Sequence, residues 1–120
     1  MTIYCSVENG ELQIKDALNS EDIWRGRPEG HEVIMAKPIP NSPDCITLLG
    51  WSDKGPQPSN LWRYSAGHGT VWKAELPKSG MDIYTNFQLE EIGLVAHSWS
   101  GYKVIIDLNT GQILSRQFVK

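Results

Sequence analysis

Three histidines and one adjacent serine are the side chains of this 120-residue chain best suited to acid–base or nucleophilic chemistry. His31, His68 and His97 have no cysteine or carboxylate at the spacing of a metal-ligand set, so we expect no metal site. His97 and Ser98 are neighbours, and neighbouring residues of a strand point to opposite faces, which prevents them from acting together as base and nucleophile. The sequence therefore predicts no catalytic residues, and we expect that the protein is not an enzyme.

The glycine-rich run and the two cysteines also favour structural roles. The glycines of residues 65–70 (SAGHGT) lack the Lys-Ser/Thr of a phosphate-binding loop, so this run predicts a turn and we expect no cofactor. Cys5 and Cys45 fit no metal spacing. In a chain without an export signal, two such cysteines are expected to be free thiols.

Length and composition indicate one globular domain without a nucleic-acid or membrane partner. A chain of 120 residues can bury a core without the help of disulfides or metal ions, so we expect a single β domain over residues 1–120. The net charge of −3 does not provide the basic surface that nucleic-acid binding uses. The first ten residues lack the parts of a signal peptide, and no stretch approaches the roughly 18 apolar residues of a membrane helix. These features predict a cytoplasmic protein.

The first predicted element is a hairpin, because the turn sequence ENG at residues 8–10 separates two alternating runs. A two-residue turn pairs Val7 with Leu12 and Cys5 with Ile14 on one apolar face, so we expect Cys5 to be buried. The opposite face is polar and carries two further pairs, Ser6 with Gln13 and Tyr4 with Lys15.

Residues 44–51 (DCITLLGW) are apolar on both faces, which is typical of a central strand covered from both sides. Other short runs with alternating patterns are separated by turns rich in Gly and Pro. We count about eight or nine short strands joined by tight hairpins. The predicted fold class is all-β, an antiparallel twisted sheet, sandwich or barrel.

The C-terminal part predicts another hairpin, with Ser100-Gly101 as a two-residue turn. This turn brings three pairs together on one apolar and aromatic face: Trp99 with Tyr102, His97 with Val104, and Val95 with Ile106. Trp72 and Trp99 are both expected on core faces. If Trp99 is buried, Trp99→Ala should cost about 3–5 kcal/mol.

Residues 17–30 (ALNSEDIWRGRPEG) form the least strand-like stretch. Ser20 followed by two acids can cap one helical turn, which we expect between Leu18 and Trp24. The glycines and the proline that follow prevent a longer helix.

The same stretch is the predicted partner-binding site. An aromatic residue between arginines on a loop is typical of an interaction anchor, although Trp24 could instead pack against the end of the core. Residues 8–32 carry seven acidic side chains against three basic ones, a balance that suits a basic partner. The predicted binding residues are Glu21, Asp22, Trp24, Arg25, Arg27 and Glu29.

About half of the chain, residues 60–120, resembles the repeats of β-propellers of the pyrroloquinoline-quinone type. The resemblance rests on the runs VWKAELP, GLVAHSW, VIIDLNTG and ILSRQF. In such repeats a Trp after a hairpin and an Asp-x-x-Thr-Gly turn recur, which Trp72 and the run Asp107, Thr110 and Gly111 match. The family pattern has a second Trp four residues after the Gly, where this chain has Ser115, and no quinone-binding residues carry over. Eight or nine strands cannot supply four four-stranded blades, so we expect no closed propeller.

The runs LPxxxxDxY and SWSGY are similar to those of a group of small uncharacterised bacterial proteins. Some small β proteins of this kind serve as immunity proteins beside bacterial toxins. The resemblance implies a protein-binding module that occludes the active site of a cognate toxin, such as a basic toxin domain. The five tryptophans on a β scaffold leave a carbohydrate- or small-ligand-binding module as an alternative, and an enzyme with an unrecognised site is the third.

Overall fold

The computed structural model describes residues 2–50, 59–77 and 82–119. Within these ranges the chain forms eleven β-strands and one short 3-10 turn, with no α-helix. Every strand pair is antiparallel, and the strands form three separate sheets rather than a closed ring. The predicted all-β antiparallel fold is confirmed, with more strands than the eight or nine expected.

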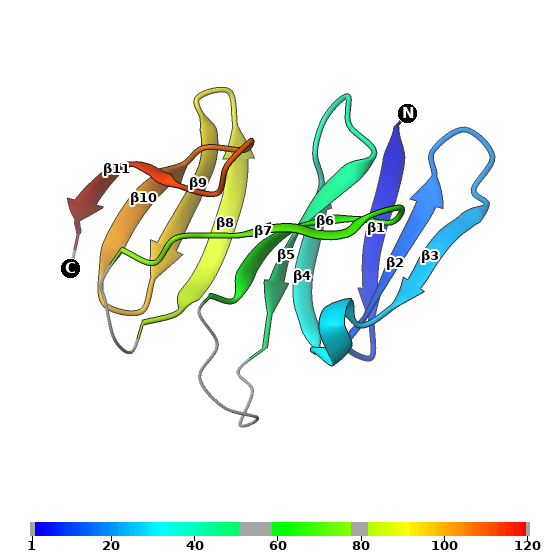
Figure 1. Ribbon diagram of the computed structural model, residues 1–120, viewed down its shortest axis with the longest axis horizontal. Coiled ribbons are helices and arrows are strands. Elements are labelled where there is room, and N and C mark those ends of the chain that lie inside the picture. The colour runs from blue at the N-terminus through cyan, green and yellow to red at the C-terminus, as the bar shows by residue number, and fades with distance from the viewer. Residues whose placement is uncertain (1, 51–58, 78–81, 120) are drawn as a thin grey trace.

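Each sheet is a meander in which strands that follow one another in sequence lie side by side (Figure 1). Sheet 1 contains β1 (Ile3–Glu8), β2 (Glu11–Asp16) and β3 (Asp22–Gly26). Sheet 2 contains β4 (Val33–Pro38), β5 (Asp44–Leu49), β6 (Leu61–Ser65) and β7 (Gly69–Lys73). Sheet 3 contains β8 (Tyr84–Glu90), β9 (Gly93–Ser98), β10 (Tyr102–Ile106) and β11 (Ile113–Phe118). The 3-10 turn η1 (Pro28–Gly30) lies between sheets 1 and 2 in the chain.

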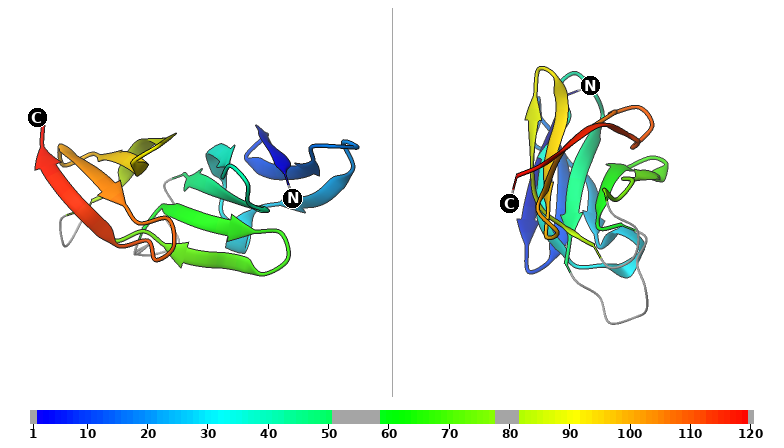
Figure 2. Two further views of the ribbon diagram at one scale, coloured as in Figure 1. Left: turned by 90° about the horizontal axis from the view of Figure 1, so that it is seen from above. Right: turned by 90° about the vertical axis from the view of Figure 1, so that its left-hand side faces the viewer.

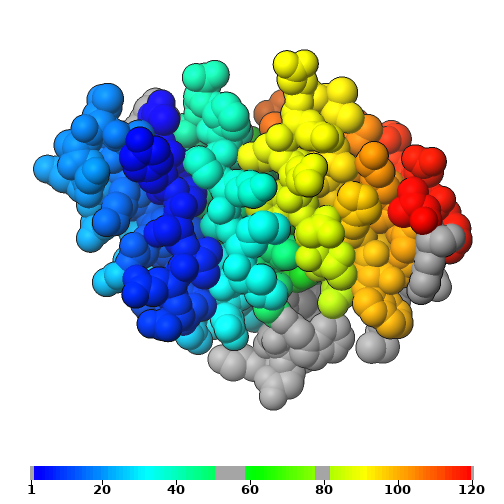
Figure 3. Space-filling view, turned by 180° about the vertical axis from the view of Figure 1, so that it is seen from behind, coloured from blue at the N-terminus to red at the C-terminus, as the bar shows by residue number. Residues whose placement is uncertain are grey.

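Sheet 2 lies between sheets 1 and 3 and packs against both of them (Figure 2). In the space-filling view, β1, β4 and β8 follow one another across one face of the molecule (Figure 3). All six residues of β5 are buried, which confirms the predicted central strand. Because side chains alternate along a strand, Cys45 and Leu49 pack in the core with sheet 1, while Ile46 and Leu48 pack in the core with sheet 3.

Two hydrophobic cores result, one at each interface. The first joins sheets 1 and 2 through Ile3, Leu12, Ile14, Val33, Cys45, Leu49, Trp62 and Tyr64. The second joins sheets 2 and 3, and its members include Ile46, Leu61, Trp72, Tyr84, Phe87, Leu94 and Ile106. Burying one large apolar side chain contributes about 1.5–3 kcal/mol, so both interfaces contribute strongly to the free energy of folding.

A buried asparagine connects sheet 2 to sheet 3 through the backbone. The Asn60 side-chain amide donates to the Tyr84 carbonyl at 2.8 Å, and its oxygen accepts from the Tyr84 amide at 2.8 Å. The same amide donates to the Leu49 carbonyl at 3.2 Å. Asn60 thus hydrogen-bonds backbone groups of two sheets, and these bonds offset the free-energy cost of burying its amide.

The Leu108 carbonyl, in the turn between β10 and β11, accepts two hydrogen bonds from sheet 2. The Trp72 indole Nε1 donates at 2.8 Å and the Arg63 Nη1 donates at 2.9 Å. Arg63 is held in place by Asp44, whose carboxylate lies 2.9 Å from its Nε. Gly111 of the same turn lies so close to the Trp72 ring that an added Cβ would approach it to 2.8 Å. Trp72 and the turn that the sequence pattern singled out are therefore in direct contact.

Sheets 1 and 3 contain the same six-residue turn, at residues 16–21 and 107–112. In the first turn, the Ser20 amide donates to the Asp16 carbonyl at 2.9 Å, and in the second the Gly111 amide donates to the Asp107 carbonyl at 2.8 Å. The aspartate side chain of each turn accepts from the backbone amide two residues later at 2.8 Å. Ser20 and Gly111 both adopt a left-handed backbone, with φ of 60° and 78°. The hairpins β2–β3 and β10–β11 are therefore closed by the same type of turn.

The register predicted for the first hairpin is confirmed at every pair. Val7 lies opposite Leu12, and Cys5 lies opposite Ile14. The polar pairs Ser6–Gln13 and Tyr4–Lys15 occupy the other face, as expected. Cys5 is only half-buried, however, because β1 is an edge strand of sheet 1.

The register predicted for the C-terminal hairpin is wrong by one residue. His97 lies opposite Lys103, and Ala96 lies opposite Val104. The Gly101 amide donates to the Ser98 carbonyl at 3.1 Å, so the loop is one residue longer than the predicted Ser100-Gly101 turn. A shift of one residue moves every side chain of one strand to the other face, which takes His97 off the core face. Trp99 falls within the loop and is 69% exposed, so it is not a core residue.

The helical turn predicted between Leu18 and Trp24 is also wrong. Residues 16–21 form the turn described above, and β3 begins at Asp22. The Asp16 side chain binds the turn from its start, which favours a tight hairpin over a helix cap at Ser20. The one 3-10 turn of the described ranges lies further along, at Pro28–Gly30.

We predict that Gly111→Ala lowers the free energy of unfolding by more than about 2 kcal/mol, because the new Cβ would be strained at φ of 78° and would collide with Trp72. Gly69→Ala has the same strain, at φ of 80°, but open space around the Cβ, and should cost about 1 kcal/mol. Gly67→Ala has neither strain nor a neighbour and should change stability by less than about 0.5 kcal/mol. Urea denaturation of the three variants measures the order, and equal costs for Gly111 and Gly69 would contradict the docking of the turn on Trp72.

Candidate functional site

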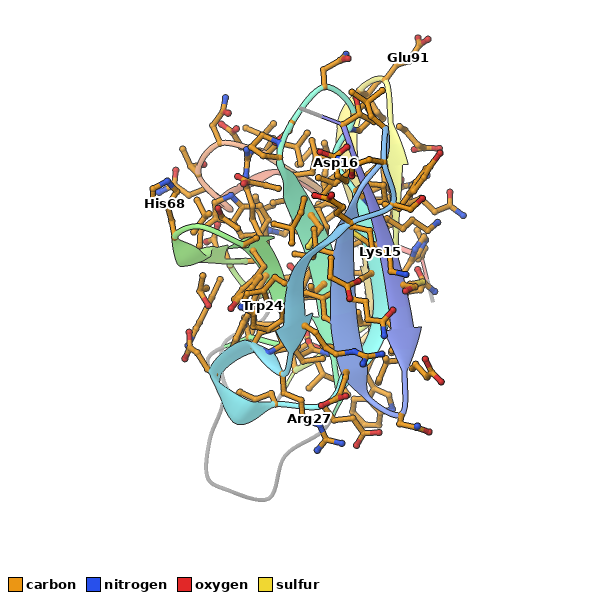
Figure 4. The ribbon with its side chains drawn as sticks, turned by 90° about the vertical axis from the view of Figure 1, so that its right-hand side faces the viewer. Lys15, Asp16, Trp24, Arg27, His68 and Glu91 are labelled. Carbon is orange, nitrogen blue, oxygen red and sulfur yellow. The ribbon has the colours of Figure 1, made fainter. Side chains whose placement is uncertain are left out.

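The six residues predicted to bind a partner lie on β3, directly before and after it, and on η1. Figure 4 shows two of them, Trp24 and Arg27, on this side of the molecule. The six residues do not share one surface. Trp24 packs toward the core and Glu29 contacts sheet 2, whereas the side chains of Glu21, Asp22, Arg25 and Arg27 are exposed. The predicted site therefore divides into a packing part and a polar part.

Trp24 lies on a strand rather than on a loop, and its side chain is half-buried. It lies opposite the fully buried Ile14 in the register of β2 and β3. Its ring packs against the Tyr64 ring of sheet 2, with the centroids 5.0 Å apart. Of the two interpretations left open by the sequence, this position matches the one in which Trp24 completes the core.

Glu29 connects η1 to the outer strand of sheet 2. Its carboxylate accepts a hydrogen bond from the Thr70 hydroxyl at 2.7 Å and pairs with the Lys73 ammonium at 3.1 Å. Lys73 in turn lies over the Trp62 ring, 4.3 Å from its centroid. The hydrogen bond from Thr70, together with Lys73, lowers the pKa of Glu29 below its ordinary value. A lowered pKa means that this contact stabilises the fold above the ordinary pKa of a glutamate and is lost as the pH falls through the folded-state value.

The other predicted residues belong to a polar outer face of sheet 1. Arg25 lies opposite Gln13, and Asp22 lies opposite Lys15, with 3.8 Å between the charged atoms of the second pair. An ion pair this exposed contributes little to stability. Arg27 donates to the Asn9 carbonyl at 3.0 Å and so connects the end of β3 to the turn of the first hairpin.

An apolar group with three exposed side chains lies at one end of sheet 3, and the sequence analysis predicted two of its members, Trp99 and Tyr102, on a core face. We call Trp99, Tyr102, Phe118 and Val119 the aromatic end of sheet 3. The side chains of Trp99, Phe118 and Val119 are 69%, 59% and 49% exposed. The Tyr102 and Phe118 rings pack edge to face with centroids 5.5 Å apart, and the Val119 amide donates to the Gly101 carbonyl at 2.8 Å. Gly101 after Trp99-Ser100 is the signal that could have revealed this loop, because three-residue hairpin loops take a glycine at their last position.

The loop that carries Trp99 is held by hydrogen bonds to the chain before β8. The Ser100 hydroxyl donates to one oxygen of the Asp82 carboxylate at 2.6 Å, and the Ser100 amide donates to the other at 3.1 Å. The Trp99 amide donates to the Ile83 carbonyl at 2.8 Å. The Ser98 hydroxyl lies 2.9 Å from that of Ser100. The polar groups beside Trp99 are thus engaged within the molecule.

Among the residues that the structure describes, no group of three or more His, Cys, Asp or Glu side chains could hold a metal ion. The described ranges also contain no helix with the length and apolar character to cross a membrane.

A family model described as Domain of unknown function (DUF7957) matches residues 44–118. The chain belongs to this family. The matched part begins at β5 and includes Trp99, Tyr102 and Phe118, while β1 to β4 lie outside it. No curated protein matches the chain.

Among solved structures, the computationally designed Ika8 protein is similar in fold to this DUF7957 member. The TM-score is 0.59 at 16% sequence identity, over 98% of this chain and 33% of the designed chain. This likeness concerns the fold alone. The three-sheet arrangement therefore occurs within a chain about three times as long.

The different environments of two tryptophans lead to a prediction on stability. We expect Trp24→Ala to lower the free energy of unfolding by at least about 1.5 kcal/mol, because it removes packing against Tyr64 and the first core. Trp99→Ala should change it by less than about 0.5 kcal/mol, because the side chain is largely in solvent. Chemical denaturation of both variants makes the comparison, and the reverse order would return Trp99 to the core and Trp24 to the surface.

Proposed function

We propose that this protein is a protein-binding module whose contact surface is the aromatic end of sheet 3. The observation that carries the proposal is the 69% exposure of Trp99 beside the exposed Phe118 and Val119. Tryptophan and tyrosine are the residues most enriched among those that dominate binding energy at protein interfaces. Large contiguous apolar patches on the surface of a folded domain often mark interaction sites.

The neighbours of Trp99 favour a protein over a carbohydrate as the ligand. A sugar presents hydroxyl groups that need free polar partners beside the aromatic platform. Here the Ser98 and Ser100 hydroxyls are hydrogen-bonded to each other, and Ser100 also binds Asp82. Phe118 and Val119, the other exposed members of this group, are apolar, so a carbohydrate-binding module is the weaker alternative.

The loop is well suited to binding because its conformation is set before a partner arrives. Asp82 fixes Ser100 by two hydrogen bonds, and the Val119 amide joins the chain terminus to Gly101. A surface that is already ordered loses less conformational entropy on binding, which leaves more of the contact energy as affinity.

A more specific form of this function is an immunity protein that occludes the active site of a cognate bacterial toxin in the cytoplasm. The acidic side chains at Glu8, Glu21 and Asp22 are exposed on sheet 1 and would speed the encounter with a basic toxin domain. We expect a toxin gene next to the gene of this protein. We also expect that cells expressing the toxin grow again when this protein is expressed with it. A toxin that remains lethal in the presence of the protein would exclude this form but not protein binding in general.

The binding function can be tested with the Trp99→Ser variant. Affinity capture from the native host identifies a partner, which is then purified and titrated against the wild type by isothermal calorimetry. Because a central aromatic anchor contributes at least about 2 kcal/mol of binding free energy, Trp99→Ser should raise the dissociation constant by roughly 30-fold or more.

Ile92→Ser is the matched control, because Ile92 is 64% exposed in the same sheet but lies in the β8–β9 turn at its opposite end (Figure 1). Its affinity should equal that of the wild type, and both variants should keep the wild-type unfolding midpoint. Equal binding by Trp99→Ser and the wild type would contradict the proposed surface.

A further inference from the structure

Cys5 and Cys45 are distant in sequence but meet at the interface between sheets 1 and 2. Cys5 lies on β1 and packs against the first hydrophobic core, of which Cys45 on β5 is a member. The two thiols form a hydrogen bond with each other, and neither is in a disulfide. The sequence predicted free thiols but contained no signal that would bring them together.

The two thiols differ in accessibility and in acidity. Cys5 is half-buried at the edge of sheet 1, whereas Cys45 is completely buried. The hydrogen bond from the Cys45 thiol lowers the pKa of Cys5 because it stabilises the Cys5 thiolate. The same bond and burial raise the pKa of Cys45. In thiol–disulfide exchange, the more accessible of two neighbouring thiols reacts first with a disulfide. The buried thiol then attacks the mixed disulfide and closes the bond between the two cysteines.

We propose that Cys5 and Cys45 form a redox-sensitive site at which thiol–disulfide exchange with a small disulfide links sheet 1 covalently to sheet 2. The Cys5 thiolate attacks one sulfur of oxidised glutathione, which forms a mixed disulfide and releases one glutathione thiolate. Cys45 then loses its proton to solvent and attacks the Cys5 sulfur, which releases the second glutathione. In sum, two protein thiols are oxidised to one disulfide and one glutathione disulfide is reduced to two thiols.

The second step becomes easier once the first has occurred. In the mixed disulfide, Cys5 no longer accepts the hydrogen bond that holds the proton on Cys45, and this bond is the main reason why the pKa of Cys45 is raised. Transient opening of the half-exposed edge at β1 admits the solvent that takes this proton. The mixed disulfide is therefore an intermediate rather than the end product.

The Cys5–Cys45 disulfide would be a covalent cross-link between sheets 1 and 2, which are otherwise held together by non-covalent contacts. Sheet 1 is held to sheet 2 by the first core, by the Trp24–Tyr64 contact, by the Glu29 contacts to Thr70 and Lys73, and by a backbone hydrogen bond from the Val33 amide to the Gly10 carbonyl. A cross-link between residues 5 and 45 closes a long loop, which restricts the unfolded chain and so stabilises the folded one. This inference concerns the opposite side of the molecule from sheet 3 and does not depend on the proposed binding function.

The test treats the folded protein with oxidised glutathione, quenches the reaction with acid and measures intact mass and the thermal midpoint. The wild type should lose two hydrogens, carry no glutathione and yield a peptide that joins Cys5 to Cys45. Its thermal midpoint should rise by at least about 5 °C over the reduced form. A wild type that stays reduced, that keeps glutathione on Cys5, or that forms the bond without a rise in the midpoint would overturn the proposal.

Two variants separate the steps. Cys45→Ala should stop at the mixed disulfide on Cys5, and Cys5→Ser should remain unreacted because Cys45 is completely buried. Glutathione on Cys45 in the Cys5→Ser variant would overturn the assigned order of attack. Should either variant fail to fold, as judged by circular dichroism, the joined peptide and the midpoint of the wild type still decide the proposal.

Discussion

The burial of β5 on both faces is the constraint on which the rest of this structure depends. A strand covered from both sides needs a sheet on each side, and neither sheet 1 nor sheet 3 buries its own apolar face without sheet 2. The two cores are not equivalent. The second also contains the buried hydrogen bonds from Asn60 to β8 and the partly buried ones from Trp72 and Arg63 to the Leu108 carbonyl, which orient sheet 3 on sheet 2. The first interface relies mainly on apolar packing, with one backbone hydrogen bond from the Val33 amide to the Gly10 carbonyl at 2.9 Å and peripheral contacts such as that of Glu29.

This difference between the interfaces connects the fold to both proposals. Because sheet 3 is fixed by directional bonds, its far end can present Trp99 on an ordered loop, held by Asp82 and bonded to the terminal strand. Because sheet 1 is held largely by packing, a covalent link there has the most to add, and the one pair of cysteines lies across that interface. Membership of the DUF7957 family covers the part of the chain with the directional bonds, and the designed Ika8 structure places the same three-sheet arrangement within a longer chain.

Local sequence patterns were enough to predict the first hairpin and the central strand. They were not enough to predict the contacts between sheets. The ENG turn left a single register in which all apolar residues share one face, so Val7 and Leu12 could be paired with certainty. The SWSG turn allows loops of two or three residues, and the choice between them decided the position of Trp99. Trp24 was predicted at the end of a helical turn but lies on β3. The error arose because a hairpin turn and a helix cap both begin with a short polar run. The meeting of Cys5 and Cys45 depends on how two sheets stack, which no spacing in the sequence encodes.

The most direct test of the account is hydrogen–deuterium exchange of the protein alone and in complex with its partner. Slower exchange shows which backbone amides are covered or stabilised when the partner binds. We predict that protection on binding appears at residues 98–102 and 117–119, around Trp99 and Phe118, and that residues 21–29 exchange at unchanged rates. Protection confined to residues 21–29, with no change around Trp99, would contradict the claim that the aromatic end of sheet 3 is the binding surface.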